Sequence, residues 1–186
     1  SKIAKEYSAA GATCISVLTD TPSFMGSKKD LGIARNSSPL PLLRKDFFID
    51  PYQVFETKYL GGDCILIILS MLSDSQAREL YQTAQEIELD SIFEVHNENE
   101  FERALSMNAK LIGINNRNLH TFETDIRTTV NLAPKFSDEL IIISESGIYN
   151  NIQIKMLREK NVNAFLVGES IIKSDNMTKA IQDLLD

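Results

Sequence analysis

A lysine lies in the middle of an apolar run in the first third of the chain. The run PLLRKDFFID, residues 41–50, places Lys45 among leucines and phenylalanines. Moving an ammonium group out of water is costly unless the group is paired. A lysine directed into a sheltered site can protonate a carbonyl, form a Schiff base or bind an anion. The structural alternative is an ion pair with Asp46 or another acid.

A glutamate occupies a comparable position in a later apolar run. Glu94 is flanked by Phe93 and Val95, and partial burial would favour its protonated form and suit the side chain for proton transfer. The structural alternative is an ion pair with Lys45, which would not exclude catalysis.

The two histidines, His96 and His120, suggest neither a catalytic triad nor a metal site. We expect His96 to be a loop residue, and His120 lies among polar residues. No HxH or HExxH motif occurs, so the sequence predicts no metal dependence.

Seven apolar runs carry these residues, and amphipathic segments separate most of them. The runs are leucine-rich or β-branched and nearly continuous, which is typical of strands covered on both faces. They span residues 14–18, 41–47, 64–69, 91–95, 111–115, 140–146 and 164–170. Between them, Asp50 and Pro51 suit a helix start, and Gly61 with Gly62 suits its end. Asn97 and Glu100 have capping-box spacing.

Strands that alternate with helices at this period indicate parallel βαβ units, in either a doubly wound sheet or a TIM barrel. Neither GxGxxG nor GxxxxGK[ST] occurs, which disfavours nucleotide-binding doubly wound sheets. Polar residues follow nearly every run, and a barrel gathers all strand ends around one opening, whereas a doubly wound sheet gathers only those near its switch point. The pattern therefore predicts an α/β fold, a TIM (β/α)8 barrel forming a single domain over residues 1–186.

The strand count is one short of a closed barrel. Seven runs are visible, and the chain opens on a helical segment that should itself follow a strand. We therefore expect the missing first strand at the N-terminus.

Composition limits the classes of partner. The 186 residues are 43% hydrophobic and 24% charged, as in soluble globular proteins, and the net charge is −7. Such an acidic chain, with an isoelectric point near 4.9, is not expected to bind nucleic acid or a membrane surface. Cys14 and Cys64 lie in apolar runs without CxxC spacing, which predicts reduced core residues of a cytoplasmic protein.

The last two runs end in glycines beside small hydroxyl residues. Gly147 lies in SESGI and Gly168 in VGES. In barrels, the loops after strands seven and eight commonly bind phosphate with their backbone N–H groups. The alternative is that these glycines only form tight turns.

Several strings, in this order, resemble the indole-3-glycerol phosphate synthase family. They are ISVLTD, FMGSKKDL, PLLRKDFFIDPYQVFE, EVHNENE, IGINNRNLHTFETD, ISESGI and FLVGES. The resemblance implies a lyase that closes the ring of 1-(2-carboxyphenylamino)-1-deoxyribulose 5-phosphate, with loss of carbon dioxide and water, in tryptophan biosynthesis. It implies a small phosphorylated substrate and neither a cofactor nor a metal.

The resemblance also implies roles for individual residues. Lys45 matches the family's general acid, and Glu94 matches a carboxylate that acts in the dehydration. Asn115 and Glu145 would hold the hydroxyls and the anilino part of the substrate. The remaining matches are Leu18, Phe24 and Phe47 against the aromatic ring, Arg117 as a supporting residue, and Ser146, Gly147, Gly168 and Glu169 around the phosphate.

One family feature has no counterpart in the sequence. Family members carry a first strand with an E-x-K-x-x-S-P-S motif, which follows a helical extension. We expect that segment in the complete protein, and we expect the chain to be inactive without it. The rival interpretations are a phosphoribosylanthranilate isomerase or lysine-based aldolase of the same architecture, and a non-catalytic phosphate-binding remnant or structural fragment.

Overall fold

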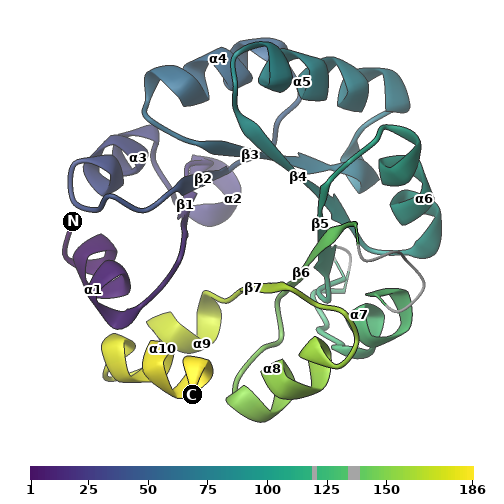
Figure 1. The fold of residues 1–186 in the computed structure, drawn as a ribbon. Coiled ribbons are helices and arrows are strands. Elements are labelled where there is room, and N and C mark those ends of the chain that lie inside the picture. The colour runs from purple at the N-terminus through teal and green to yellow at the C-terminus, as the bar shows by residue number, and fades with distance from the viewer. Residues whose placement is uncertain (119–120, 134–138) are drawn as a thin grey trace. The chain divides into compact units, whose positions relative to one another are not determined.

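The computed structural model describes residues 1–118, 121–133 and 139–186, and strands alternate with helices throughout them (Figure 1). The chain divides into two compact units, Ser1–Ile92 and Phe93–Asp186. The first unit contains strands β1 (Ile15–Leu18), β2 (Leu42–Lys45) and β3 (Cys64–Ile68). The second contains β5 (Leu111–Asn115), β6 (Ile141–Glu145) and β7 (Ala164–Leu166), and β4 (Asp90–Val95) spans the boundary. All seven predicted strands are present; the single barrel domain stays a prediction.

The strands are parallel and follow one another in chain order. In the first unit, Leu18 of β1 pairs with Lys45 of β2, and Leu43 of β2 pairs with Cys64 of β3. In the second unit, Asn115 of β5 pairs with Glu145 of β6, which also pairs with Leu166 of β7. Parallel neighbours place their carboxyl ends at the same edge, so the polar strand ends of each unit lie together. The predicted α/β class is confirmed.

Helices connect the strands, and in each unit the longer ones lie on one face of the strands (Figure 1). The first unit has α1 (Lys2–Ala10), α2 (Thr21–Phe24), α3 (Lys28–Arg35), α4 (Pro51–Tyr59), the 3-10 turn η1 (Leu69–Met71) and α5 (Asp74–Glu86). The second has α6 (Glu98–Ser106), α7 (Arg127–Leu132), α8 (Asn151–Arg158), α9 (Glu169–Ile172) and α10 (Met177–Leu185). No helix within the described ranges is long and apolar enough to cross a membrane.

The predicted ends of α4 are confirmed. Asp50 is the N-cap, Pro51 is the first helical residue, and Gln53 completes a capping box with Asp50. Gly61 follows the helix with φ of 85°, a left-handed conformation that glycine adopts without strain.

The predicted capping box of α6 forms only in part. The Asn97 side chain accepts a hydrogen bond from the Glu100 backbone N–H at 3.0 Å, as predicted. The Glu100 carboxylate, however, accepts from the backbone N–H of His96 at 2.8 Å. The Glu100 side chain therefore binds the backbone of His96, the residue before the N-cap, in place of the N-cap backbone itself.

The core of the first unit packs β1 and β2 against helices. Its buried residues are Ala4, Ile15, Val17, Leu31, Ala34 and Leu42. The prediction that Cys14 belongs to a core is wrong, because Cys14 is exposed and Cys64 is only partly buried. In β1, Ile15 and Val17 are buried while the alternate residues face solvent, and Cys14 shares that exposed face.

Candidate functional site

Lys45 is the last residue of β2 and is partly buried. Its neighbours in the chain, Arg44 in β2 and Asp46 just after it, are both buried. Alternate strand residues share a face, so Arg44 and Asp46 point together and Lys45 points to the other side. Asp46 forms an ion pair with Arg44. The structural alternative considered from the sequence had paired Asp46 with Lys45.

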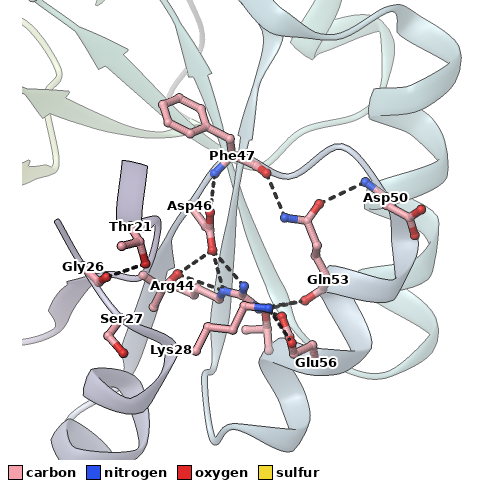
Figure 2. Close-up of polar contacts among 12 residues, drawn as sticks. Thr21, Gly26, Ser27, Lys28, Arg44, Asp46, Phe47, Asp50, Gln53 and Glu56 are labelled. Atoms are coloured by element: carbon pink, nitrogen blue, oxygen red, sulfur yellow. Dashed lines mark hydrogen bonds and ion pairs between the residues drawn. The ribbon is translucent and has the colours of Figure 1, made fainter. Parts of the chain in front are cut away.

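The Arg44 guanidinium is fully buried in a cluster of polar groups (Figure 2). Its Nη2 donates to Asp46 Oδ2 at 2.8 Å, and its Nη1 lies 3.0 Å from Glu56 Oε2. Nη1 also donates to Thr57 Oγ1, and Nε donates to Thr19 Oγ1 at 3.0 Å. These contacts join the residue after β1, strand β2 and α4 around one buried cation.

The same cluster extends to the start of α3 through Glu56. Lys28 Nζ donates to Glu56 Oε1 at 2.8 Å, as Figure 2 shows. Burial favours a higher pKa for the Glu56 carboxyl, but Lys28 and Arg44 outweigh it and hold that pKa below its usual value. Glu56 is therefore an anion shared by two cations.

Two of the predicted aromatic-binding residues contact each other. The rings of Phe24, at the end of α2, and Phe47, after β2, are stacked with centroids 5.3 Å apart. The Asp46 carboxylate accepts from the Phe47 N–H at 2.9 Å, and the Gln53 amide donates to the Phe47 carbonyl at 2.8 Å (Figure 2). Leu18 ends β1, beside Lys45 in the strand register, and is 37% exposed. The first unit thus presents apolar side chains near the lysine.

In the second unit, Glu94 lies near the end of β4 and is only 1% exposed. Its Oε1 accepts a hydrogen bond from Asn115 Nδ2 at 3.0 Å. Asn115 is held in turn, because its Oδ1 accepts from the Arg117 N–H at 3.0 Å. Glu145, also 1% exposed, ends β6 and pairs with Asn115 in the register of β5 and β6. The structure therefore brings the predicted residues Glu94 and Asn115 into contact, with Glu145 on the adjoining strand.

His96 adds a contact that the sequence interpretation missed. Its Nε2 lies 3.4 Å from Glu94 Oε1, and its Nδ1 lies 3.2 Å from Glu100 Oε2. Burial alone would lower the pKa of His96, but the carboxylates of Glu100 and Glu94 outweigh it and raise that pKa to about 9. The i, i+4 spacing of His96 and Glu100 at a helix start was the available signal. His120 lies outside the described residues.

Asn116 fixes the loop that follows β6. Its Nδ2 donates to the Ser146 carbonyl at 3.0 Å and to Ser144 Oγ at 3.1 Å, while its Oδ1 accepts from Thr129. Ser146 and Gly147 have φ of 66° and 74°. A Cβ on Gly147 would lie 2.5 Å from Thr124 Cγ2, so this position requires glycine for both reasons. These residues shape the first predicted phosphate loop.

The second predicted phosphate loop begins at Gly168, the N-cap of the short helix α9. A Cβ there would meet nothing within 4 Å. The carboxylate of Glu169 binds two cations, at 2.6 Å from Arg117 Nη2 and 2.6 Å from Lys173 Nζ. These partners lower the pKa of Glu169. Arg117 therefore links the end of β5 to this loop.

Within the described parts of the chain, no group of three or more His, Cys, Asp or Glu side chains is arranged to hold a metal ion.

Comparisons with known proteins identify the family. The family profile described as Indole-3-glycerol phosphate synthase matches residues 1–184. An indole-3-glycerol phosphate synthase of Legionella pneumophila strain Lens is 46% identical over 184 residues, which cover 99% of this chain and 71% of that relative. One from Acinetobacter baumannii strain SDF is also 46% identical, over 98% of this chain and 69% of the relative.

Solved structures support the fold alone. A thiamine phosphate pyrophosphorylase from Pyrococcus furiosus superposes with a TM-score of 0.72 at 13% identity, over 99% of this chain and 86% of that one. A structure described as native KDPGal superposes with a TM-score of 0.68 at 10% identity, over 98% of this chain and 85% of that one. Because nearly the whole chain matches the family profile and its relatives, the chain belongs to the indole-3-glycerol phosphate synthase family, the decarboxylating TIM-barrel lyases of tryptophan biosynthesis.

Proposed function

We propose that Lys45 and Glu94 are the general acid and the proton-transferring carboxylate of an indole-3-glycerol phosphate synthase. The observation that carries this proposal is the buried Glu94 carboxylate, held by the Asn115 amide at 3.0 Å. A carboxylate so well shielded from water is poised for proton transfer, provided that polar partners fix it. Lys45 supplies the complementary acid at the carboxyl end of β2.

Each step of the reaction has a residue suited to it. The ring carbon bearing the carboxylate attacks the ribulose carbonyl carbon, while the Lys45 ammonium donates a proton to the carbonyl oxygen. Carbon dioxide leaves, and the bonding electrons restore the aromatic ring. The hydroxyl group then departs as water, with Glu94 moving the proton that completes the indole. Asn115 and Glu145 hold the substrate during both stages.

The aromatic part of the substrate is assigned to the first unit. The stacked rings of Phe24 and Phe47 provide an apolar surface, and Leu18 lies beside Lys45 in the strand register. Aromatic rings bind each other in offset or edge contacts, which suits an anilino group.

The phosphate is assigned to the two loops after β6 and β7. Ser146, Gly147 and Gly168 contribute mainly backbone N–H groups, and Glu169 lies at the start of α9. The open space above Gly168 leaves room for an anion near those donors. Arg117 would support the site through its ion pair with Glu169.

We further propose that the two units form one barrel domain and that a further strand completes it. The matched part of the Legionella pneumophila relative is 71% of its length, so part of that relative has no counterpart in this sequence. A strand from such a segment would close the barrel and complete the phosphate site. We propose a cytoplasmic location, and no nucleic acid or membrane as a partner.

Formation of indole-3-glycerol phosphate tests the proposal. The assay uses the chain alone and the chain joined to the unmatched segment of the Legionella pneumophila relative. In the active form, Lys45→Ala and Glu94→Gln should each reduce kcat by about 10²–10⁴. Lys110→Ala is the control, because Lys110 is exposed and precedes β5 at the opposite strand end.

Three outcomes separate the interpretations. Near-normal kcat in Lys45→Ala would refute its role as the acid. Trapping of substrate on Lys45 by borohydride would favour the aldolase. Phosphate binding without any indole-3-glycerol phosphate, even in the joined protein, would favour the non-catalytic remnant.

A further inference from the structure

A histidine lies between the proposed base and the start of a helix. Glu94 is the penultimate residue of β4, and His96 follows the strand directly. His96 Nε2 lies 3.4 Å from Glu94 Oε1. Nε2 is buried, and the described part of the chain offers it no hydrogen bond. The Glu94 carboxylate is therefore the group that this nitrogen faces.

The other side of the imidazole is held by Glu100. Nδ1 lies 3.2 Å from Glu100 Oε2, and the same oxygen accepts the backbone N–H of His96 at 2.8 Å. Glu100 Oε1 accepts from the Asn97 amide at 2.7 Å. A carboxylate with this many donors cannot turn without losing several of them, so it fixes the orientation of the ring.

The electrostatic setting favours a charged imidazole. His96 has one carboxylate on each side, and only 14% of its side chain is exposed. These carboxylates outweigh the effect of burial and raise the pKa of His96 to about 9. The start of α6 favours a negative charge on Glu100 through the helix dipole. Interaction with His96 holds the pKa of Glu100 below its usual value, against the effect of burial.

We propose that His96 is a positioning residue: Glu100 holds it as an imidazolium that keeps Glu94 ionised and oriented toward Asn115. The inference rests on the proposed role of Glu94. An ionised Glu94 can accept a proton at neutral pH, whereas a carboxylate so deeply buried without a cation would tend to be protonated. The competing role for His96 is purely structural, as part of the cap of α6.

Substitutions at His96 and Glu100 leave the other charged groups near Glu94 unchanged. Glu145 ends β6, and Glu98 lies in the first turn of α6. Lys45, which the proposed function brings to the same site, is also unchanged by substitutions at His96 or Glu100. A difference between these variants and the unaltered chain therefore reports the contribution of the His96–Glu100 pair.

The first test measures the protonation of His96 by NMR in the full chain and needs no activity. The chain has only two histidines, so a His120→Asn variant assigns the two imidazole signals. We expect His96 to titrate near pH 9, and to titrate at lower pH in both Glu94→Gln and Glu100→Gln. Titration at or below pH 6.5, or a value unaffected by Glu94→Gln, would overturn the proposal.

The second test measures kcat/KM against pH in the active protein. We expect His96→Asn and Glu100→Gln to move the acidic limb to higher pH by about 1–3 units, the usual effect of an opposite charge within a few ångströms. Glu102→Gln changes net charge equally but is exposed on α6, so it should leave the limb in place. An unmoved limb in His96→Asn would contradict the proposal.

A third variant separates charge from hydrogen bonding. The amide of His96→Gln can reach toward Glu94 as Nε2 does, yet it carries no charge. If the acidic limb of kcat/KM stays at its original pH in this variant, the charge on His96 has no role and the proposal fails. A different result would refute the proposed function itself: full activity in Glu94→Gln. That result would not affect the NMR test of His96.

Discussion

Substituting methionine for Arg44 tests the buried charge cluster beside Lys45. Methionine keeps an unbranched apolar stem and removes a guanidinium that is fully buried. Asp46 and Glu56 then lose the cation that lies 2.8 and 3.0 Å away, in sites where their side chains are 9% and 15% exposed. Removing one partner of a buried ion pair costs about 3–5 kcal/mol. We expect Arg44→Met to lower the free energy of unfolding by that amount.

The assay is urea unfolding followed by circular dichroism. With an m-value of about 2 kcal/mol/M, the expected loss moves the midpoint down by about 1.5–2.5 M. The double variant Arg44→Met with Asp46→Asn should be more stable than Arg44→Met alone, because the amide removes the unpaired charge and still accepts the Phe47 N–H.

Arg127→Met is the matched control. Arg127 also pairs with an aspartate, Asp125, but its side chain is 80% exposed, and exposed ion pairs stabilise proteins little. The same substitution should therefore leave the urea midpoint nearly unchanged. A loss below about 1 kcal/mol in Arg44→Met would show that the buried cluster is not the source of stability assigned to it.

Three further predictions concern pH, a glycine and the unmatched segment. The pKa of His96 is raised from 6.5 to about 9, so the charged imidazole stabilises the fold fully below pH 6.5. This stabilisation, at most about 3 kcal/mol, is lost as pH rises through 9. The urea midpoint should therefore fall over this pH range, and His96→Asn should make the fall smaller. Gly147→Ala should cost about 1–2 kcal/mol and weaken phosphate binding measured by calorimetry, whereas Gly32→Ala, with open space around it, should not. The joined protein described above should unfold more cooperatively than the chain alone, and should gain activity with that change; full activity of the chain alone would contradict this.

Elements with strong local signals could be predicted from the sequence. The apolar runs predicted where all seven strands lie, and Asp50, Pro51 and Gly61 predicted the ends of α4. Cys14 was predicted wrongly because an apolar run does not reveal that one face of β1 is exposed. The third strand ends one residue earlier than the predicted run: Leu69 lies in the turn η1, where the chain leaves the strand.

Candidate site residues came from residue type and strand position or from the family resemblance. Lys45 and Glu94 were singled out by their places in apolar runs, Asn115 by the resemblance, and their roles stay predictions. The partners that hold them were missed, because such contacts depend on three-dimensional detail. Arg44 meets Glu56 only after β2 and α4 pack together, and the His96 ring meets Glu94 only because Glu100 binds both its Nδ1 and its backbone N–H.

The charges around the two proposed catalytic groups are balanced differently. Beside Lys45, Arg44 and Lys28 are matched by Asp46 and Glu56, so this cluster is neutral and adds little net field to the lysine. Around Glu94, the imidazole of His96 lies between two carboxylates, those of Glu94 and Glu100. With the positive charge proposed for His96, these three side chains together carry one negative charge. The Arg44 cluster beside Lys45 is thus neutral, whereas the side chains of Glu94, His96 and Glu100 together are negative. The proposed charge on His96 would therefore offset only part of the negative charge beside Glu94, which favours an ionised Glu94 carboxylate without neutralising the whole group.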